Sequence, residues 1–495
     1  MNKQLRRDAV KGMGWAFFSS VSVRVFQILT TMTLAKLLVP ADFGVFSLTT
    51  IIIAAMSLIP HVGFAQVLIY QQEDVRKTAN TAFILSMTSS AVLSAMIYIC
   101  APNISQLFGA PLIAMPLRLM SVGLAIYGLV TVPQALLDRE LKFRLRIIPE
   151  ITAAFVYAVV AISLALLNFG VWSMVIAWTV MSIVEAVATW IVSSWRPRLE
   201  FRKDCARVII AYGGHLTLAT LASFLFLQID NASVGKWLGL KALGFYSIAF
   251  TTCNMPATNL TSVVNRVMFP TYSKLNGNKS EVRSFYLKTI KHLSSLTLPA
   301  VAVLMTLPEP FIRLFYGQKW EGAIPLFHIL AVYGLMRSLG ATSSTVFMSM
   351  GRTWMVQRVS LTQLILGAGL VYPVAMRFGV SGVAVLFSAA YFTGTAYGLI
   401  SVLRMLDIRL SEWFNSIKAP AVSALIAGGA TWLMISTTRL SWLNLGLETL
   451  IVLGGYGIII LILDKSVFTD IRSALKKPSD QTSAPSHETS PEFSE

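Results

Sequence analysis

The sequence predicts an all-α polytopic membrane protein of about fourteen transmembrane helices, arranged as two six-helix lobes related by a parallel repeat, plus two extra C-terminal helices. The 495 residues are 55% hydrophobic with a mean hydropathy of +0.68, and only 13% are charged, against about 25% in soluble domains. Apolar runs of about 20 residues, each able to cross a hydrocarbon core of ~30 Å, recur along the chain. A short turn near the N-terminus also recurs in the middle of the sequence.

Hydropathy and helix-breaking residues define the individual spans. The first segment is basic and then apolar up to Val39 without an A-x-A cleavage site, so it is predicted to be a retained helix rather than a signal peptide. With boundaries uncertain by several residues, the spans lie at about 12–39, 44–70, 80–101, 112–136, 147–168, 171–195, 206–236, 242–268, 286–308, 322–349, 355–376, 381–405, 415–436 and 442–463.

The loops between these spans carry an asymmetric set of basic residues. With the N-terminus inside, the inner segments hold 29 of the 40 Lys and Arg residues and the outer loops hold 7. Because positive charge marks the cytoplasmic side, both termini are predicted to be cytoplasmic. Most of the net charge of +17 is then topogenic, so no nucleic-acid partner is expected.

The duplicated turn divides the chain into repeats. Residues 37–48, LLVPADFGVFSL, align with residues 237–248, WLGLKALGFYSI, so that Gly44 matches Gly244. Six predicted spans separate the two copies, an even number that places both on the outer face. Glycine permits a tight reversal and close packing there. The predicted units are residues 1–200 and 201–410 as the two lobes, residues 411–464 as two additional helices, and residues 465–495 as a polar, disordered cytoplasmic tail.

The motifs of common catalytic sites are missing from the sequence. No G-x-x-x-x-G-K-[ST], D-x-D, H-E-x-x-H or G-x-S-x-G motif is present, and the three cysteines show no metal-ligand spacing. Every predicted outer loop is short. We therefore expect neither an enzyme nor a bound metal or cofactor.

Ionisable residues inside the predicted spans are the candidate functional groups, because charge at membrane depth is costly and usually faces a cavity or a partner. Cationic side chains outnumber anionic ones inside the predicted spans. Guanidinium groups can bind phosphate oxygens in a bidentate manner. Two interpretations remain open: a cationic site for an anionic substrate, or interhelical ion pairs such as Arg24 with Asp230 and Arg337 with Glu185. The candidate substrate-binding cations are Arg24, Arg118, Arg266 and Arg337. The candidate coupling or ion-pair anions are Asp230 and Glu185.

Several segments resemble the polysaccharide-transport family, which comprises Wzx-like oligosaccharide flippases and exopolysaccharide exporters of the MATE-like superfamily. The similarity extends from about residue 5 to 460. The segments that carry it are LAKLLVPADFGVFSL, GFAQVLIYQ (63–71), LLDRELKFR (136–144), IDNASVGKWLGLKALGFYSIA (229–249) and VNRVMFPTYSKL (264–275).

This resemblance implies two six-helix lobes around a central cavity that opens alternately to either side. It also implies that the substrate is an undecaprenyl-pyrophosphate-linked oligosaccharide, moved to the periplasmic leaflet for exopolysaccharide, O-antigen or capsule synthesis. Membrane lipids and the polysaccharide polymerase or export machinery are the expected partners. Two alternatives stay open: a cation-coupled drug antiporter, which the lack of a carboxylate in the first span disfavours, and a non-transporting scaffold of a synthase complex.

Overall fold

The computed structural model describes residues 22–70, 75–198, 200–275, 277–435 and 441–464. Within these ranges the chain is helical and contains no strand, which confirms the all-α class. Residues 22–37 form the first described helix. The start of the first predicted span and the predicted tail 465–495 lie outside the described residues.

The remaining helices follow in chain order. The first group comprises α2 (Pro40–Tyr70), α3 (Val75–Leu107), η1 (Pro111–Ile113), α4 (Ala114–Tyr127), α5 (Thr131–Arg139), α6 (Phe143–Leu166), α7 (Val171–Val192) and α8 (Lys203–Trp237). The second comprises α9 (Leu240–Leu275), α10 (Lys279–Thr306), α11 (Pro308–Phe311), η2 (Ile312–Tyr316), η3 (Gln318–Ala323), α12 (Ile324–Ser349), α13 (Thr353–Met405), α14 (Leu410–Ile435) and α15 (Trp442–Leu463).

Nine of the described helices are long and apolar enough to cross a membrane, or eleven if two bent pairs each count as one span. One bent pair, α4 with α5, covers the predicted span 112–136 and turns by 44° at the break. The 53-residue helix α13 contains two predicted spans, and Gly379 between them has a non-helical backbone with φ 63°. Glycine tolerates this left-handed conformation without a Cβ clash. The total of fourteen spans stays a prediction.

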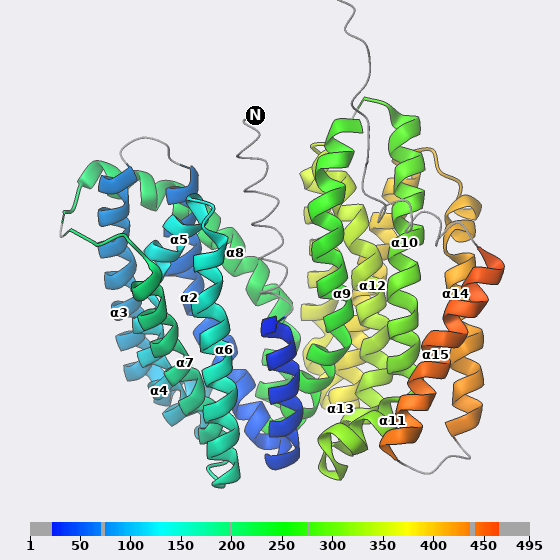
Figure 1. Ribbon diagram of the computed structural model, residues 1–495, viewed down its shortest axis with the longest axis horizontal. Helices are drawn as coiled ribbons and strands as arrows, with labels where there is room; N and C mark the ends of the chain where they lie inside the picture. The colour runs from blue at the N-terminus through cyan, green and yellow to red at the C-terminus, as the bar shows by residue number, and fades with distance from the viewer. Residues whose placement is uncertain (1–21, 71–74, 199, 276, 436–440, 465–495) are drawn as a thin grey trace, which may run out of the picture.

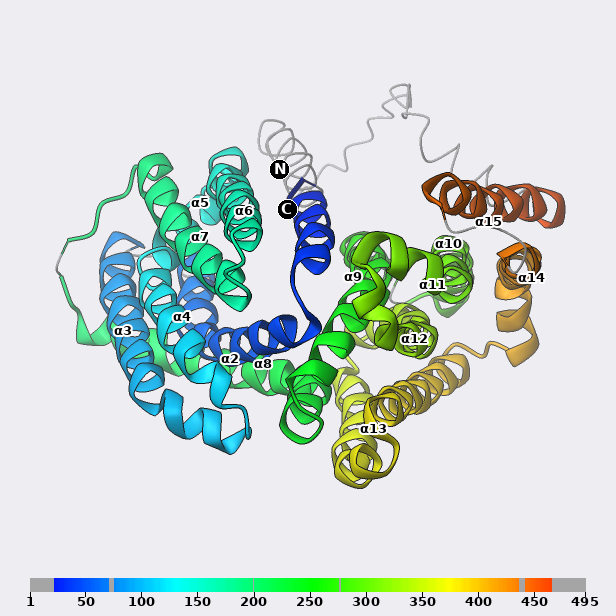
Figure 2. The same ribbon diagram turned by 90° about the horizontal axis from the view of Figure 1, so that it is seen from below.

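The helices are arranged in two groups (Figure 1). α2–α7 lie on one side and α9–α15 on the other, while residues 22–37 lie between them. The long helix α8 runs obliquely from the first group to the second and contacts both α3 and α13 (Figures 1 and 2). The groups approach each other most closely at one end, where α2 and α9 begin. We call this end the turn face.

The two copies of the repeated turn meet at the turn face. A Cβ atom on Gly44 would lie 1.8 Å from the carbonyl oxygen of Leu240, and a Cβ atom on Gly244 would lie 1.8 Å from that of Pro40. The contacts are thus reciprocal, as a two-fold relation between the repeats requires. Because no side chain fits at either position, the first turns of α2 and α9 pack backbone against backbone.

A buried tryptophan extends this contact. The Trp320 side chain is fully buried, and its Nε1–H donates a 2.7 Å hydrogen bond to the carbonyl oxygen of Ala35. Its ring lies edge-on against Phe43, with centroids 5.0 Å apart, and against Phe245 at 6.0 Å. Trp320 therefore joins the segment before α12 to both copies of the turn.

Candidate substrate cavities

Two cavities of similar size meet at one arginine. The first, about 680 Å³, lies between α8, α12 and α13, and we call it the α13 cavity. The second, about 670 Å³, lies between residues 22–37, α9, α10, α12 and α15, and we call it the α15 cavity. Arg337, in the middle of α12, lines both.

Arg337 is held in place by one contact from α9. Its Nη1 donates a hydrogen bond of 3.3 Å to Oδ1 of Asn254, whose own amide nitrogen is fixed by the carbonyl oxygen of Phe250 at 2.9 Å. A guanidinium group has five N–H donors. This is the one hydrogen bond that Arg337 makes to the described residues, so it can still bind a bidentate anion.

Arg24 contributes a second positive charge to the α15 cavity. It lies on helix 22–37, is exposed, and lines the cavity together with Arg337. No ion pair or hydrogen bond to another described residue engages it. The predicted pairs of Arg24 with Asp230 and of Arg337 with Glu185 do not form in this structure.

The α15 cavity adjoins a smaller apolar one of about 420 Å³ beside α11 and α15. Both are lined by Val303, Leu304, Phe311 and Thr449. The α15 cavity therefore continues into a hydrocarbon-lined space, which neither Arg24 nor Arg337 lines.

The predicted anions lie apart from these cations. Asp230 is buried on α8, where it accepts hydrogen bonds from the Tyr246 hydroxyl at 2.9 Å and from the Asn231 backbone N–H at 2.7 Å. It borders a small void next to the α13 cavity, which is also lined by Tyr333 and Tyr391. Neutral donors thus satisfy this carboxylate.

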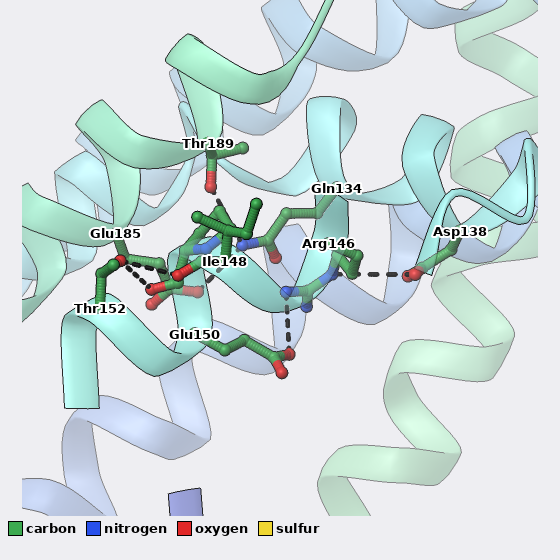
Figure 3. Close-up of polar contacts among 9 residues, drawn as sticks. Gln134, Asp138, Arg146, Ile148, Glu150, Thr152, Glu185 and Thr189 are labelled. Atoms are coloured by element: carbon green, nitrogen blue, oxygen red, sulfur yellow. Dashed lines mark hydrogen bonds and ion pairs between the residues drawn. The ribbon is translucent and has the colours of Figure 1, made fainter. Parts of the chain in front are cut away.

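Glu185 belongs to a polar cluster between α5, α6 and α7 (Figure 3). Its Oε1 accepts a 2.9 Å hydrogen bond from the buried amide of Gln134, which also lies 3.5 Å from the Thr189 hydroxyl. Nearby, Arg146 forms an ion pair with Glu150 at 2.8 Å. Glu185 lines neither of the two large cavities.

The other two predicted cations do not join Arg24 and Arg337. Arg118 donates from Nε to the carbonyl oxygen of Tyr98 at 3.3 Å and lies over the Tyr98 ring, on the α3–α4 pair. It lines neither large cavity. Arg266 lies on α9, but its side chain is outside the described residues.

The structure adds a residue that the sequence analysis did not select. Gln363, on α13, is only 7% exposed and lines both the α13 cavity and the void beside Asp230. A polar amide in the middle of the predicted span 355–376 is a usable signal in the sequence, but a criterion based on ionisable groups alone overlooks it.

Comparison with known proteins assigns the family. A family model described as polysaccharide biosynthesis protein matches residues 33–325 of the 495. This chain belongs to the polysaccharide biosynthesis protein family. The cavity arginine Arg24 precedes the matched region, and Arg337 follows it.

Three proteins named for polysaccharide biosynthesis or transport are similar to this chain in sequence. The chain is 24% identical over 326 residues to the succinoglycan biosynthesis transport protein ExoT of Rhizobium meliloti, a match that covers 66% of each chain. It is 21% identical over 445 residues to the teichuronic acid biosynthesis protein TuaB of Bacillus subtilis, covering 86% of this chain and 90% of that one. It is 22% identical over 352 residues to the lipopolysaccharide biosynthesis protein WzxC of Escherichia coli, covering 70% and 71%.

Solved structures share the fold. The lipid II flippase MurJ in an inward closed conformation aligns with a TM-score of 0.70 and 19% identity, over 93% of this chain and all of that one. An inward-facing multidrug resistance MATE transporter aligns with a TM-score of 0.63 and 16% identity, over 78% and 94%. The polysaccharide biosynthesis protein described here is thus a multi-pass membrane protein with a MurJ- and MATE-like fold.

Proposed function

We propose that this protein is an inner-membrane flippase that moves undecaprenyl-pyrophosphate-linked oligosaccharides from the cytoplasmic to the periplasmic leaflet. The product would supply exopolysaccharide, O-antigen or capsule assembly. The main supporting observation is that Arg24 and Arg337, from different parts of the chain, line the same cavity. Family membership supports the coarser statement that the chain is a transporter of polysaccharide biosynthesis rather than an enzyme.

In this proposal each part of the site has a chemical role. Arg24 and Arg337 bind the pyrophosphate oxygens through charge-assisted hydrogen bonds, which are shorter and stronger than neutral ones. The adjoining apolar cavity lies on the side where a polyprenyl chain would leave the site for the bilayer. Binding shifts the protein between its two states only by differential affinity, so net flow needs an ion gradient or removal of product.

Reconstituted vesicles test this function. The probe is undecaprenyl pyrophosphate carrying a fluorescent sugar, and the readout is its exposure on the far leaflet to an impermeant quencher. Arg24→Ala and Arg337→Ala should each slow transport by about 10- to 100-fold, since a hydrogen bond to a charged group contributes about 1.5–3 kcal/mol. Arg118→Ala makes the same chemical change outside the cavities and should retain the wild-type rate.

The outcomes separate the proposed function from its alternatives. A drug antiporter would depend on intramembrane carboxylates, so Asp230→Asn and Glu185→Gln would abolish transport while Arg24→Ala spared it. A scaffold would tolerate alanine at all the cavity arginines. Normal transport by well-expressed Arg24→Ala and Arg337→Ala proteins would refute the flippase proposal.

A further inference from the structure

The α13 cavity contains a buried amide without a protein partner. Gln363 is more than nine-tenths buried and lines the cavity. Among the described residues, none forms a hydrogen bond with its side chain. The amide lies against Gly394, where a Cβ atom would be 2.6 Å from Nε2. A glycine thus provides the space that Gln363 occupies.

A largely buried amide without a protein partner is usually hydrogen-bonded to a ligand or to an ordered water, and this amide borders the cavity. The Gln363 amide offers two donors and an acceptor oxygen with two lone pairs. Neighbouring hydroxyl groups on a sugar ring, each both donor and acceptor, match that set. A lipid tail matches none of it.

Other polar side chains share the lining with a larger aliphatic surface. The side chains of Ser344, Gln357, Ser360 and Thr395 face the cavity together with Gln363. Tyr391 and Phe226 supply aromatic surface, and such faces pack against the apolar C–H face of a sugar ring. Hydroxyl and amide groups beside an aromatic ring favour the binding of an uncharged polyol such as a sugar.

The position of the cavity fixes which part of a lipid-linked sugar it would hold. Arg337 separates the α13 cavity from the α15 cavity, and the α15 cavity continues into the apolar space beside α15. If the pyrophosphate binds at Arg337 and the lipid extends toward α15, the sugar attached to the other end of the pyrophosphate would lie in the α13 cavity.

We propose that the α13 cavity is a sugar subsite, in which Gln363 binds hydroxyl groups of the sugar attached directly to the pyrophosphate. This assignment rests on the proposed function and extends it, because it places glycan recognition on α8, α12 and α13. Gln363 would then determine preference for the first sugar, while Arg337 would bind any lipid pyrophosphate.

Equilibrium binding in lipid nanodiscs tests the subsite with two radiolabelled probes: undecaprenyl pyrophosphate and undecaprenyl pyrophosphate bearing one glucose. The wild-type protein should bind the glucosylated probe more tightly. Gln363→Leu should lose about three- to tenfold of affinity for that probe, the effect of one or two neutral hydrogen bonds. Its affinity for the bare probe should stay within about twofold of wild type.

Three further measurements complete the test. Gln357→Leu alters an exposed amide in the same cavity, poses no folding risk, and should also reduce the preference for glucose. Gln106→Leu, the same change at an exposed site on α3, should leave it intact. Without ligand, Gln363→Leu should unfold at the wild-type temperature or above, since it removes no hydrogen bond to a described residue; loss of a buried structural hydrogen bond would lower that temperature.

Some results would overturn the subsite. The first is that the wild-type protein binds the two probes with equal affinity. The second is that the Gln363→Leu protein keeps the wild-type preference for the glucosylated probe. The third is that Gln363→Leu lowers the affinity for both probes equally. Failure of the flippase proposal is a separate result: in that case wild-type protein would move neither probe across the vesicle membrane.

Discussion

At the scale of single residues, the choice of arginine at position 337 is itself informative. Lysine would also place a positive charge in the cavity, but it is a point charge without a planar fork. The Arg337 guanidinium uses one edge to bind Asn254. Its remaining donors can then bind two phosphate oxygens in a fixed orientation.

This geometry predicts a graded effect of substitution. Arg337→Lys should weaken binding of undecaprenyl pyrophosphate by about tenfold, because it keeps the charge but loses bidentate contact and the bond to Asn254. Arg337→Ala should weaken binding further, and Asn254→Ala less than either, since it loosens the guanidinium without removing it. Binding titrations check the order; equal affinities of the lysine and wild-type proteins would contradict it.

The sequence identified Arg24 and Arg337 because charge within an apolar span is rare enough to be noticed. It could not separate them from Arg118, which also lies within a predicted span, although nearer its outer end. The difference depends on the α3–α4 pairing, which brings Tyr98 beside the Arg118 guanidinium. Gln363 was missed for a related reason: an uncharged amide becomes significant only when the structure shows that nothing pairs with it.

At the scale of elements, the sequence located the helices well and their breaks less well. Apolar length predicted the separate spans 355–376 and 381–405, and the structure has the break between them, because the backbone of α13 is non-helical at Gly379. The bend between α4 and α5 was not predicted. The repeat was found from Gly44 and Gly244, but only the structure shows that the two turns touch. Sequence periodicity carries no information about which helices meet.

The contact between the turns gives a sharp prediction for α2 and α9. Gly44→Ala should destabilise the protein by about 1–3 kcal/mol, because the new methyl group collides with a backbone carbonyl that cannot rotate away. The effects of Gly44→Ala and Gly244→Ala should be less than additive, since separation of the helices by one substitution makes room for the other.

Thermal unfolding in detergent measures these effects. Gly454→Ala is the matched control: it lies in α15, and a Cβ atom there would meet nothing within 4 Å. We expect it to unfold at the wild-type temperature. Wild-type stability of both Gly44→Ala and Gly244→Ala would show that the turns do not pack as described.

At the scale of the whole molecule, the contacts define which side is closed. The reciprocal glycine contact and Trp320 join the two helix groups at the turn face, while the groups diverge toward the opposite end (Figure 1). With the predicted orientation, the turn face is periplasmic and the structure is an inward state. Under the proposed function, export would require that the contact between α2 and α9 opens.

Cysteine accessibility tests the orientation and the closed face together. In a protein whose three native cysteines are replaced, Ser360→Cys places a thiol in the α13 cavity. A membrane-impermeant maleimide should label it in inside-out vesicles and much more slowly in right-side-out vesicles. Adding Gly44→Ala should raise labelling from the periplasmic side, because it separates the helices that close that face. If the thiol at position 360 is labelled equally from both sides in the protein that retains Gly44, the turn face does not close the cavity to the periplasmic side.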